Sequence, residues 1–285
     1  MTTDKTTEQP PLTNRGVELH PDYLAITCWG TPSQAFPIVY RTLWGMEPER
    51  WDDPLYKHTH GARGYDGFWS GPDGSKFYGF PSNESNTYCS FELSGKPLAE
   101  IVDLHGKLAS MKLAFGQENI KIRASRFDLA WDYCPFSPLE AREAWKAGKV
   151  KTRIPLHSYR WMESPEGNTF YAGSPKSQKR LRVYDRRGYT RLEMQARKDN
   201  SDSLFLDYLY FPENLTGWLC GVVTWEMPWF EQFMQGPIRL KVEGDTDATK
   251  LRNFRAYIGR LLPSLLIAKE LFGGCLLYTS DAADE

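Results

Sequence analysis

A tyrosine and a glutamate stand among arginines in residues 169–197. The spacing of this stretch predicts three short strands joined by tight turns, and side chains two residues apart on a strand share a face. One strand would present Tyr184 between two arginines, and the next would present Glu193 between two more. These four arginines are Arg182, Arg186, Arg191 and Arg197. A phenol and a carboxylate among arginines suit chemistry on a phosphodiester.

A tyrosine hydroxyl can attack a phosphodiester and stay linked to the 5′ end of the cleaved strand. Because a phenol is mostly protonated at neutral pH, nearby cations are needed to make it an effective nucleophile. A divalent ion can polarise the phosphate, and arginines can offset the charge that develops on its oxygens. We therefore expect Tyr184 as the nucleophile, with Arg182, Arg186 and Arg191 as catalytic partners and Mg²⁺ or Mn²⁺ as the cofactor.

Oxygen ligands for such an ion come from a second strand, expected at residues 121–133. Its period of two places Arg126, Asp128 and Asp132 on one face. Asp128 lies nearer the strand centre and is the better candidate ligand, together with Glu193, since such ions take carboxylate oxygens and water. Asp132 would lie about 13 Å further along the strand. It joins the same ion only if the strand bends, and a role at the strand end is the alternative.

The charges along the chain are unevenly distributed. Residues 121–200 contain 18 lysines and arginines against 9 aspartates and glutamates, although the whole chain has a net charge of −1. Such a basic block is expected of a surface that binds nucleic acid, and a solvated basic face is the alternative. The turn at residues 173–177 lacks the spacing of a nucleotide-binding loop and is expected to contact the DNA backbone. The candidate DNA-binding residues are Ser174, Lys176, Lys179, Arg180, Arg197 and Arg126.

The remaining elements predict an α+β fold with a central antiparallel sheet and flanking helices. The two halves share a rhythm of strands followed by a helix, which favours a duplicated unit. Strands are expected at 22–29, 64–70, 75–80, 86–93 and 157–162, and helices at 31–43, 98–115, 137–149, 202–211 and 247–271, with 215–233 more helix than strand.

The composition and the ends of the chain indicate the cellular compartment and the extent of the folded part. No apolar run approaches the roughly 20 residues of a membrane span, so no membrane partner is expected. The five cysteines are scattered, which is typical of a reducing cytoplasm. We expect a disordered tail at 1–18, an N-terminal half at 19–120 and a catalytic half at 121–274. Residues 275–285 resemble a peptide translated from adapter DNA and are set aside as non-native.

Four segments together resemble the replication initiation factor family, also called Rep-trans. The family comprises rolling-circle plasmid initiators of the pT181 type, with relatives in phages and conjugative elements. The segments are RFDLAWD at 126–132, TFYAGSPKS at 169–177, RVYDR at 182–186 and RLE at 191–193. Their order and spacing match over residues 124–199, and residues 22–29 are similar to the first strand of the family.

The resemblance implies a site-specific nicking and rejoining enzyme. Its tyrosine cuts one strand at an origin and becomes linked to the 5′ phosphate, and that position is Tyr184. The family's metal-binding acids correspond to Asp128 and Glu193. Arg186 stands where the family usually has lysine, which is not geometrically equivalent. The connection at residues 185–190 is short and predicts a tight hairpin, with Tyr189 at its turn as a second candidate nucleophile.

These observations leave three functional hypotheses. The leading one is an initiator of rolling-circle replication, which would act on origin DNA with an extruded or single-stranded nick site. Its expected protein partners are a host helicase and a second copy of the chain. One alternative is a conjugative relaxase that nicks a transfer origin by the same chemistry. The other is a DNA-binding regulator without catalytic activity.

Overall fold

The computed structural model describes residues 16–46, 57–58, 65, 68–71, 74–79, 88–236 and 238–240. The helix expected at 247–271 and the tail at 275–285 lie outside this part. Within the described residues, no helix is both long enough and apolar enough to cross a membrane.

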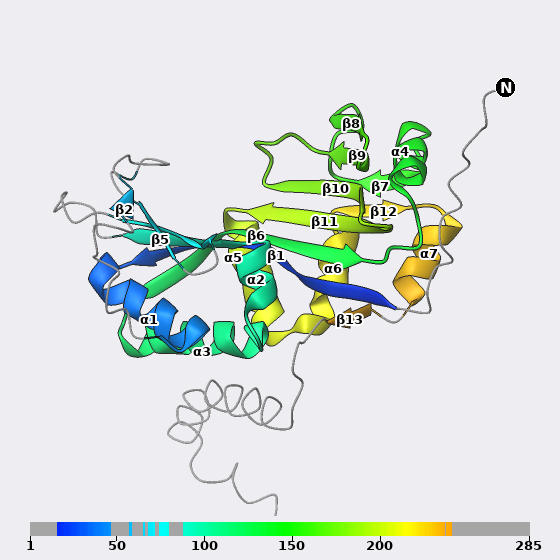
Figure 1. Ribbon diagram of the computed structural model, residues 1–285. Helices are drawn as coiled ribbons and strands as arrows, with labels where there is room; N and C mark the ends of the chain where they lie inside the picture. The colour runs from blue at the N-terminus through cyan, green and yellow to red at the C-terminus, as the bar shows by residue number, and fades with distance from the viewer. Residues whose placement is uncertain are drawn as a thin grey trace, which may run out of the picture.

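Eleven strands of the described chain form one sheet (Figure 1). Its order is β2-β3-β4-β5-β1-β6-β11-β10-β9-β8, and neighbours along this path are antiparallel. Strand β13 pairs with β1 in parallel, and β7 and β12 form a separate pair. With helices alongside, this architecture confirms the predicted α+β fold with a central antiparallel sheet.

The strands are β1 (Val17–Trp29), β2 (Lys57–His58), β3 (Phe68–Ser70), β4 (Lys76–Tyr78), β5 (Cys89–Ser94), β6 (Lys121–Asp132), β7 (Val150–Thr152), β8 (Tyr159–Ser164), β9 (Gly167–Ala172), β10 (Lys179–Arg186), β11 (Tyr189–Arg197), β12 (Val223–Trp225) and β13 (Ile238–Leu240). The helices are α1 (Pro32–Trp44), α2 (Lys96–Glu100), α3 (Leu104–Gln117), α4 (Pro138–Lys146), α5 (Asp199–Tyr210), α6 (Leu215–Cys220) and α7 (Pro228–Gln235), with a 3₁₀ turn η2 (Pro212–Asn214).

The sheet consists of two halves with the same connectivity. In each half a long strand leads into a helix, and a series of antiparallel strands then returns to pair with that long strand. In the first half β5 returns beside β1, and in the second β11 returns beside β6. The long strands β1 and β6 pair with each other at the centre. This arrangement agrees with the duplicated unit expected from the rhythm of the sequence.

The sheet has one apolar face and one charged face. On β6 the buried side chains of Phe127, Leu129 and Trp131 alternate with those of Asp128 and Asp132. The apolar face packs against helices, and α1 and α3 lie below the sheet in Figure 1. Phe127 contacts two rings of α5, those of Phe205 and Tyr208, at centroid distances of 5.5 and 5.4 Å. The charged side chains therefore project from the opposite face of the same strands.

The N-terminal half differs from the expected boundaries in two places. Strand β1 begins at Val17 and not at residue 22, because its first residues pair with β13 and with the end of β6. The single helix expected at 98–115 is two helices, α2 and α3. The break contains Asp103, which has a left-handed backbone with φ of 53° and caps α3 by accepting a bond from the Gly106 amide at 3.2 Å.

The segment at 215–233 also contains more than helix. Residues 223–225 form β12, which pairs with β7, and helices α6 and α7 lie on either side. Trp225 is buried on this strand, and its indole donates to the Ala141 carbonyl at 3.2 Å. Residues 223–225 are a strand despite the apolar pattern of the segment, because they pair with β7.

Phe127→Ala tests the packing of α5 on the central strand. Removing a fully buried ring leaves a cavity, so we expect the free energy of unfolding to fall by about 3–5 kcal/mol. Urea unfolding followed by circular dichroism measures the change. Leu139→Ala is the control because Leu139 is exposed on α4, and it should change stability by less than about 0.5 kcal/mol. Equal small effects for both variants would show that Phe127 does not anchor α5.

Candidate active site

Strands β10 and β11 form the hairpin that carries most of the site. Their register places Arg182 opposite Glu193 and Tyr184 opposite Arg191. Arg187 and Gly188 make the two-residue turn, with φ of 46° and 89°. Two positive φ angles are typical of the primed turns that match the twist of a hairpin. The tight hairpin and the three strands expected at 169–197 are thus confirmed.

The hydroxyl of Tyr184 lies between two guanidinium groups. Its oxygen accepts a hydrogen bond from Arg182 Nη2 at 3.2 Å and another from Arg186 Nη1 at 3.3 Å. The Arg182 guanidinium also lies over the Tyr184 ring, 4.2 Å from its centroid. The three side chains come from alternate positions of β10, as the strand period predicts. The arrangement provides positive charge at the phenol oxygen.

Arg182 also joins the tyrosine to the carboxylate on the next strand. Its Nη2 donates to Glu193 Oε2, and Gln195 Nε2 donates to Glu193 Oε1 at 2.9 Å. Burial works against the charge of Arg182, but the charges of Glu193 and Tyr184 outweigh it and raise the pKa of Arg182. The guanidinium therefore stays charged while it contacts both groups.

Asp128 on β6 lies directly opposite Gln195 on β11. Its carboxylate is 1 % exposed and accepts hydrogen bonds from Arg126, whose guanidinium lies 4.0 Å from the centroid of the Tyr23 ring. Burial raises the pKa of Asp128 to about 7, although Arg126 opposes the shift and Glu193 adds to it. A cation at this carboxylate would favour its ionised form.

The oxygen atoms on this part of the sheet could serve as ligands for a metal ion. Asp128 and Glu193 are buried, and the nearby Gln195 Oε1 is buried without a hydrogen-bond partner within the described structure. An unpartnered amide oxygen beside two carboxylates fits the hard oxygen ligands that Mg²⁺ and Mn²⁺ prefer. No group of three histidine, cysteine, aspartate or glutamate side chains among the described residues could hold a metal ion. The set available is therefore two carboxylates and one amide, with water for the remainder.

Asp132 belongs to a different cluster from Asp128. Its carboxylate accepts hydrogen bonds from Arg191, with Nη2 at 2.8 Å from Oδ2, and from the Tyr189 hydroxyl at 3.3 Å. His20 Nε2 lies 3.0 Å from the same Oδ2. Arg191 is 3 % exposed and also donates to Asp22 Oδ1 at 2.6 Å. Asp132 and Arg191 therefore belong to one cluster of ion pairs. This cluster adjoins Tyr184 because Arg191 lies directly opposite Tyr184 on the neighbouring strand.

Two members of this cluster, His20 and Asp22, were not among the residues expected from the sequence. Both come from β1, more than 100 residues before their partners. The pairing of β1 with β6 shifts register between Pro21 and Tyr23, so Asp22 occupies a β-bulge. A proline inside a strand is a signal for a bulge. Pro21 is therefore the sequence signal for a bulge at this point of β1, where the direction of the neighbouring Asp22 side chain changes.

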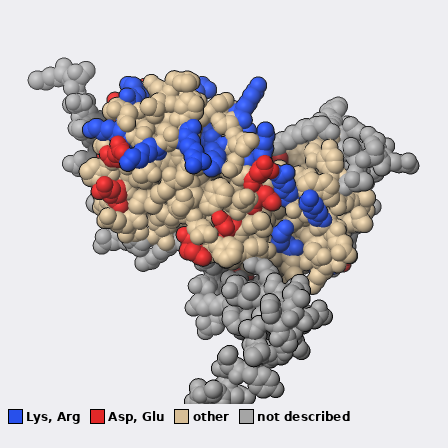
Figure 2. Space-filling view, turned by 180° about the vertical axis from the view of Figure 1, so that it is seen from behind, with Lys and Arg blue, Asp and Glu red and all other residues tan. Residues whose placement is uncertain are grey.

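The turn at residues 173–178 joins β9 to β10 beside the site. Ser174 and Lys176 are exposed, whereas Lys179 and Arg180 are half-buried. Arg197 Nη1 donates to the Pro175 carbonyl at 2.7 Å, and its amide donates to the Gln178 carbonyl at 2.8 Å. Arg197 therefore holds the turn in place. Figure 2 shows lysine and arginine side chains gathered over the upper part of one face, with acidic side chains close to them.

Asp185, the neighbour of Tyr184, fixes β10 to the β8–β9 hairpin. Its Oδ2 accepts a hydrogen bond from the Asn168 amide at 2.9 Å. Gly167 has a φ of 133°, and a Cβ there would lie 2.5 Å from Asp185 Cβ. Only glycine satisfies both the backbone angle and the close approach. This contact helps to fix the position of β10, which carries Tyr184.

The first half of the fold repeats part of this layout. Lys76 lies opposite Glu92, as Arg182 lies opposite Glu193, and Tyr78 follows Lys76 by two residues. The Tyr78 hydroxyl is buried and donates to Glu92 Oε2 at 3.2 Å. A tyrosine bonded directly to a carboxylate is a poor nucleophile compared with one between guanidinium groups. The duplication therefore supplies a tyrosine and a glutamate on adjacent strands in both halves, and the tyrosine on β10 accepts hydrogen bonds from two arginines.

Asp132→Asn tests the ion-pair cluster through its pH dependence. Burial alone would raise the pKa of Asp132, but hydrogen bonds from His20 and Arg191 hold it well below its usual range. Such a carboxylate contributes stability that is complete above its unfolded pKa of about 3.9 and is lost as the pH falls toward the folded pKa. At pH 7 we expect the substitution to lower the free energy of unfolding by about 3 kcal/mol, since it leaves the buried Arg191 with only one of its two charge partners, Asp22.

Urea unfolding of both proteins at pH 7, 5 and 3 measures this difference, which should shrink only below about pH 4. Glu143→Gln removes an exposed charge and should change stability by less than about 1 kcal/mol at each pH. A difference between wild type and Asp132→Asn that is the same at pH 7 and pH 3 would contradict the lowered pKa.

Comparisons with known proteins place the fold. No family model matches the chain, and no curated protein matches it in sequence. Among solved structures, the chain is similar to a rolling circle replication initiator protein from Geobacillus stearothermophilus, with a TM-score of 0.61 and 18 % sequence identity. The match covers 80 % of this chain and 100 % of the other. The two proteins therefore share a fold over the whole length of the initiator structure.

Proposed function

We propose that this protein initiates rolling-circle replication by nicking and rejoining one DNA strand through Tyr184. The observation that carries the proposal is the position of the Tyr184 hydroxyl, between Arg182 and Arg186 and one strand away from the buried Glu193. The shared fold with a rolling circle replication initiator protein supports the same role.

The proposed reaction is a transesterification. The Tyr184 oxygen attacks the phosphorus, a new O–P bond forms, and the bond from phosphorus to the 3′ oxygen of the preceding nucleotide breaks. The phenol loses its proton, and the departing 3′ oxygen gains one to become a hydroxyl. Because one phosphodiester replaces another, the 3′ hydroxyl can later attack the tyrosyl linkage and rejoin the strand. No external energy source is needed.

The arginines supply two parts of this chemistry. Arg182 and Arg186 stabilise the phenolate as the proton leaves, because both donate to its oxygen. The same groups can contact the non-bridging oxygens of the attacked phosphate, which gain charge in the transition state. Arg191 acts differently: it is bound to Asp132 and Asp22 and positions the strand opposite Tyr184.

We further propose that Mg²⁺ or Mn²⁺ is held by Asp128 and Glu193, with Gln195 Oε1 as a third oxygen. Both carboxylates are now covered by arginines, Arg126 on Asp128 and Arg182 on Glu193. These arginines would move toward the DNA phosphates when the ion is present. The ion would act as a Lewis acid on the phosphate when bound.

Origin DNA would lie across the charged face of the sheet. Ser174 and Lys176 on the turn before β10 are exposed beside Lys179 and Arg180. They would contact backbone phosphates and orient the DNA strand over Tyr184. Such phosphate contacts position the DNA but do not read its bases. Arg126 and Arg197 would contribute charge at the edge of the same surface.

Tyr184→Phe should abolish nicking while leaving the fold unchanged. Incubation with Mg²⁺ or Mn²⁺ and supercoiled DNA carrying the cognate origin should give nicked DNA with the protein on its 5′ end. We expect a loss of at least about 10³-fold in nicking, because the nucleophile itself is removed. Tyr159→Phe, on the exposed edge strand β8, is the matched control. Normal nicking by Tyr184→Phe would exclude the proposed nucleophile.

Asp128→Asn and Glu193→Gln test the metal site without measuring cleavage. Titration of the free protein with Mn²⁺, followed by electron paramagnetic resonance, gives the affinity for the ion. Each variant should bind Mn²⁺ at least about tenfold more weakly, because an amide is a poorer ligand than a carboxylate. Glu213→Gln, on the exposed η2 turn, should bind like wild type. If all three variants bind equally well, the ion is held elsewhere.

A further inference from the structure

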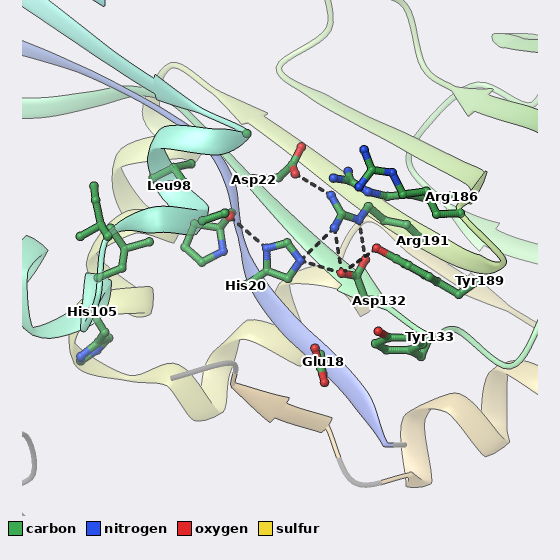
Figure 3. Close-up of a pocket in the computed structure, with 16 residues that line it drawn as sticks. Glu18, His20, Asp22, Leu98, His105, Asp132, Tyr133, Arg186, Tyr189 and Arg191 are labelled. Atoms are coloured by element: carbon green, nitrogen blue, oxygen red, sulfur yellow. Dashed lines mark hydrogen bonds and ion pairs between the residues drawn. The ribbon is translucent and has the colours of Figure 1, made fainter. Parts of the chain in front are cut away.

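A pocket of about 580 Å³ lies between the sheet and helices α2 and α3 (Figure 3). The segment from α2 to α3 contributes an apolar wall with Leu98, Ile101 and Leu104. Opposite it, His20, Asp132 and Arg191 form a polar wall (Figure 3). A concave site with one apolar wall and a few convergent polar groups is the usual form of a small-ligand site.

The pocket adjoins Tyr184 through shared residues. Arg186 lines it and also donates a hydrogen bond to the Tyr184 hydroxyl. Arg191 lines it as well and is the cross-strand partner of Tyr184. The pocket and the Tyr184 hydroxyl are therefore connected through the side chain of Arg186.

Two aromatic rings on the sheet side would suit a nucleobase. Tyr133 and Tyr189 lie with their centroids 4.6 Å apart and their planes at 34°. The Tyr189 hydroxyl donates a hydrogen bond to Asp132, and Tyr189 also lines the pocket. Bases stack on such rings, and the contribution of one base is about 1–3 kcal/mol.

The backbone of the pocket is strained at Tyr133. This residue has a φ of 62° and lines the pocket. A left-handed backbone is unfavourable for residues with a bulky side chain, and such strain tends to collect at functional sites. Here the Tyr133 ring lies against the ring of Tyr189.

We propose that this pocket binds an unpaired nucleobase of the strand that Tyr184 attacks, next to the scissile phosphate. The inference rests on the proposed function, because it takes the strand to be the one cleaved. The ring of the base would stack on Tyr189 and Tyr133 and face the apolar wall of α2. Glu18, which also lines the pocket, would accept a hydrogen bond from an exocyclic amino group, so cytosine is preferred over thymine. The protein would thereby select the nucleotide at the nick by its base.

Photocrosslinking in the Tyr184→Phe background tests the pocket without any need for nicking. The probe is a pool of 12-nucleotide single strands of random sequence, each with one 5-iododeoxycytidine. Ultraviolet light links the iodinated base to adjacent aromatic side chains, and mass spectrometry identifies them. We expect crosslinks at Tyr133 or Tyr189, and fewer with a matching 5-iododeoxyuridine pool. Crosslinks confined to other parts of the protein would overturn the proposal.

Two variants test the pocket by affinity for the same pool. Ala99 lines the pocket and is exposed, so Ala99→Trp fills the space with little demand on the core. We expect it to raise the dissociation constant at least about fivefold, as loss of one stacked base would. Ala147→Trp, an exposed alanine at the end of α4, is the matched control and should bind like wild type. Equal affinity of the two tryptophan variants would contradict the pocket assignment.

Tyr189→Ala is the second variant, with Tyr159→Ala as its control, and thermal melting confirms that each is folded. Tyr189→Ala should weaken binding and remove the crosslink at that position. If wild type nicks its origin but the pocket takes up no base, this inference fails and the proposed function stands. If the pocket binds the base but wild type never nicks, the proposed function fails and the binding site stands.

Discussion

Side chains on β6, β10 and β11 alternate between a face packed by helices and a face that carries charge. The apolar face fixes the register, because a slip of one residue would bury Asp128, Glu193 and the arginines in the core. Phe127, Leu192 and Val183 are fully buried on that face. The positions of the charged groups on the other face follow from this packing. The site is thus held by a core that takes no part in its chemistry.

Arg182 is the central link on the charged face. It contacts Glu193 on β11, and it both donates to and stacks on Tyr184 of its own strand. Each buried carboxylate of β6 and β11 pairs with an arginine: Asp128 with Arg126, Glu193 with Arg182 and Asp132 with Arg191. Without such partners a buried carboxylate would be strongly unfavourable. The arginines that would meet a DNA phosphate also keep the unliganded sheet stable.

The local layout of the site could be predicted from the sequence, since it depends on the period of two and on short turns. Tyr184 with its two arginines, the pairing of β10 with β11 and the turn at Arg187 and Gly188 follow from spacing alone. The contribution of β1 could not be predicted in the same way. Asp22 reaches Arg191 only because β1 pairs with β6 and carries a bulge. Contacts between strands more than 100 residues apart depend on topology, which local patterns do not encode.

In the proposed reaction Tyr184, and not Tyr189, becomes linked to DNA. After reaction with origin DNA and nuclease digestion, trypsin separates the two tyrosines, because it cuts after arginine. Tyr184 lies in the peptide 183–186 and Tyr189 in the peptide 188–191. Mass spectrometry should find the residual nucleotide on Tyr184 in the first peptide. A nucleotide on the second peptide, or on neither, would contradict the account.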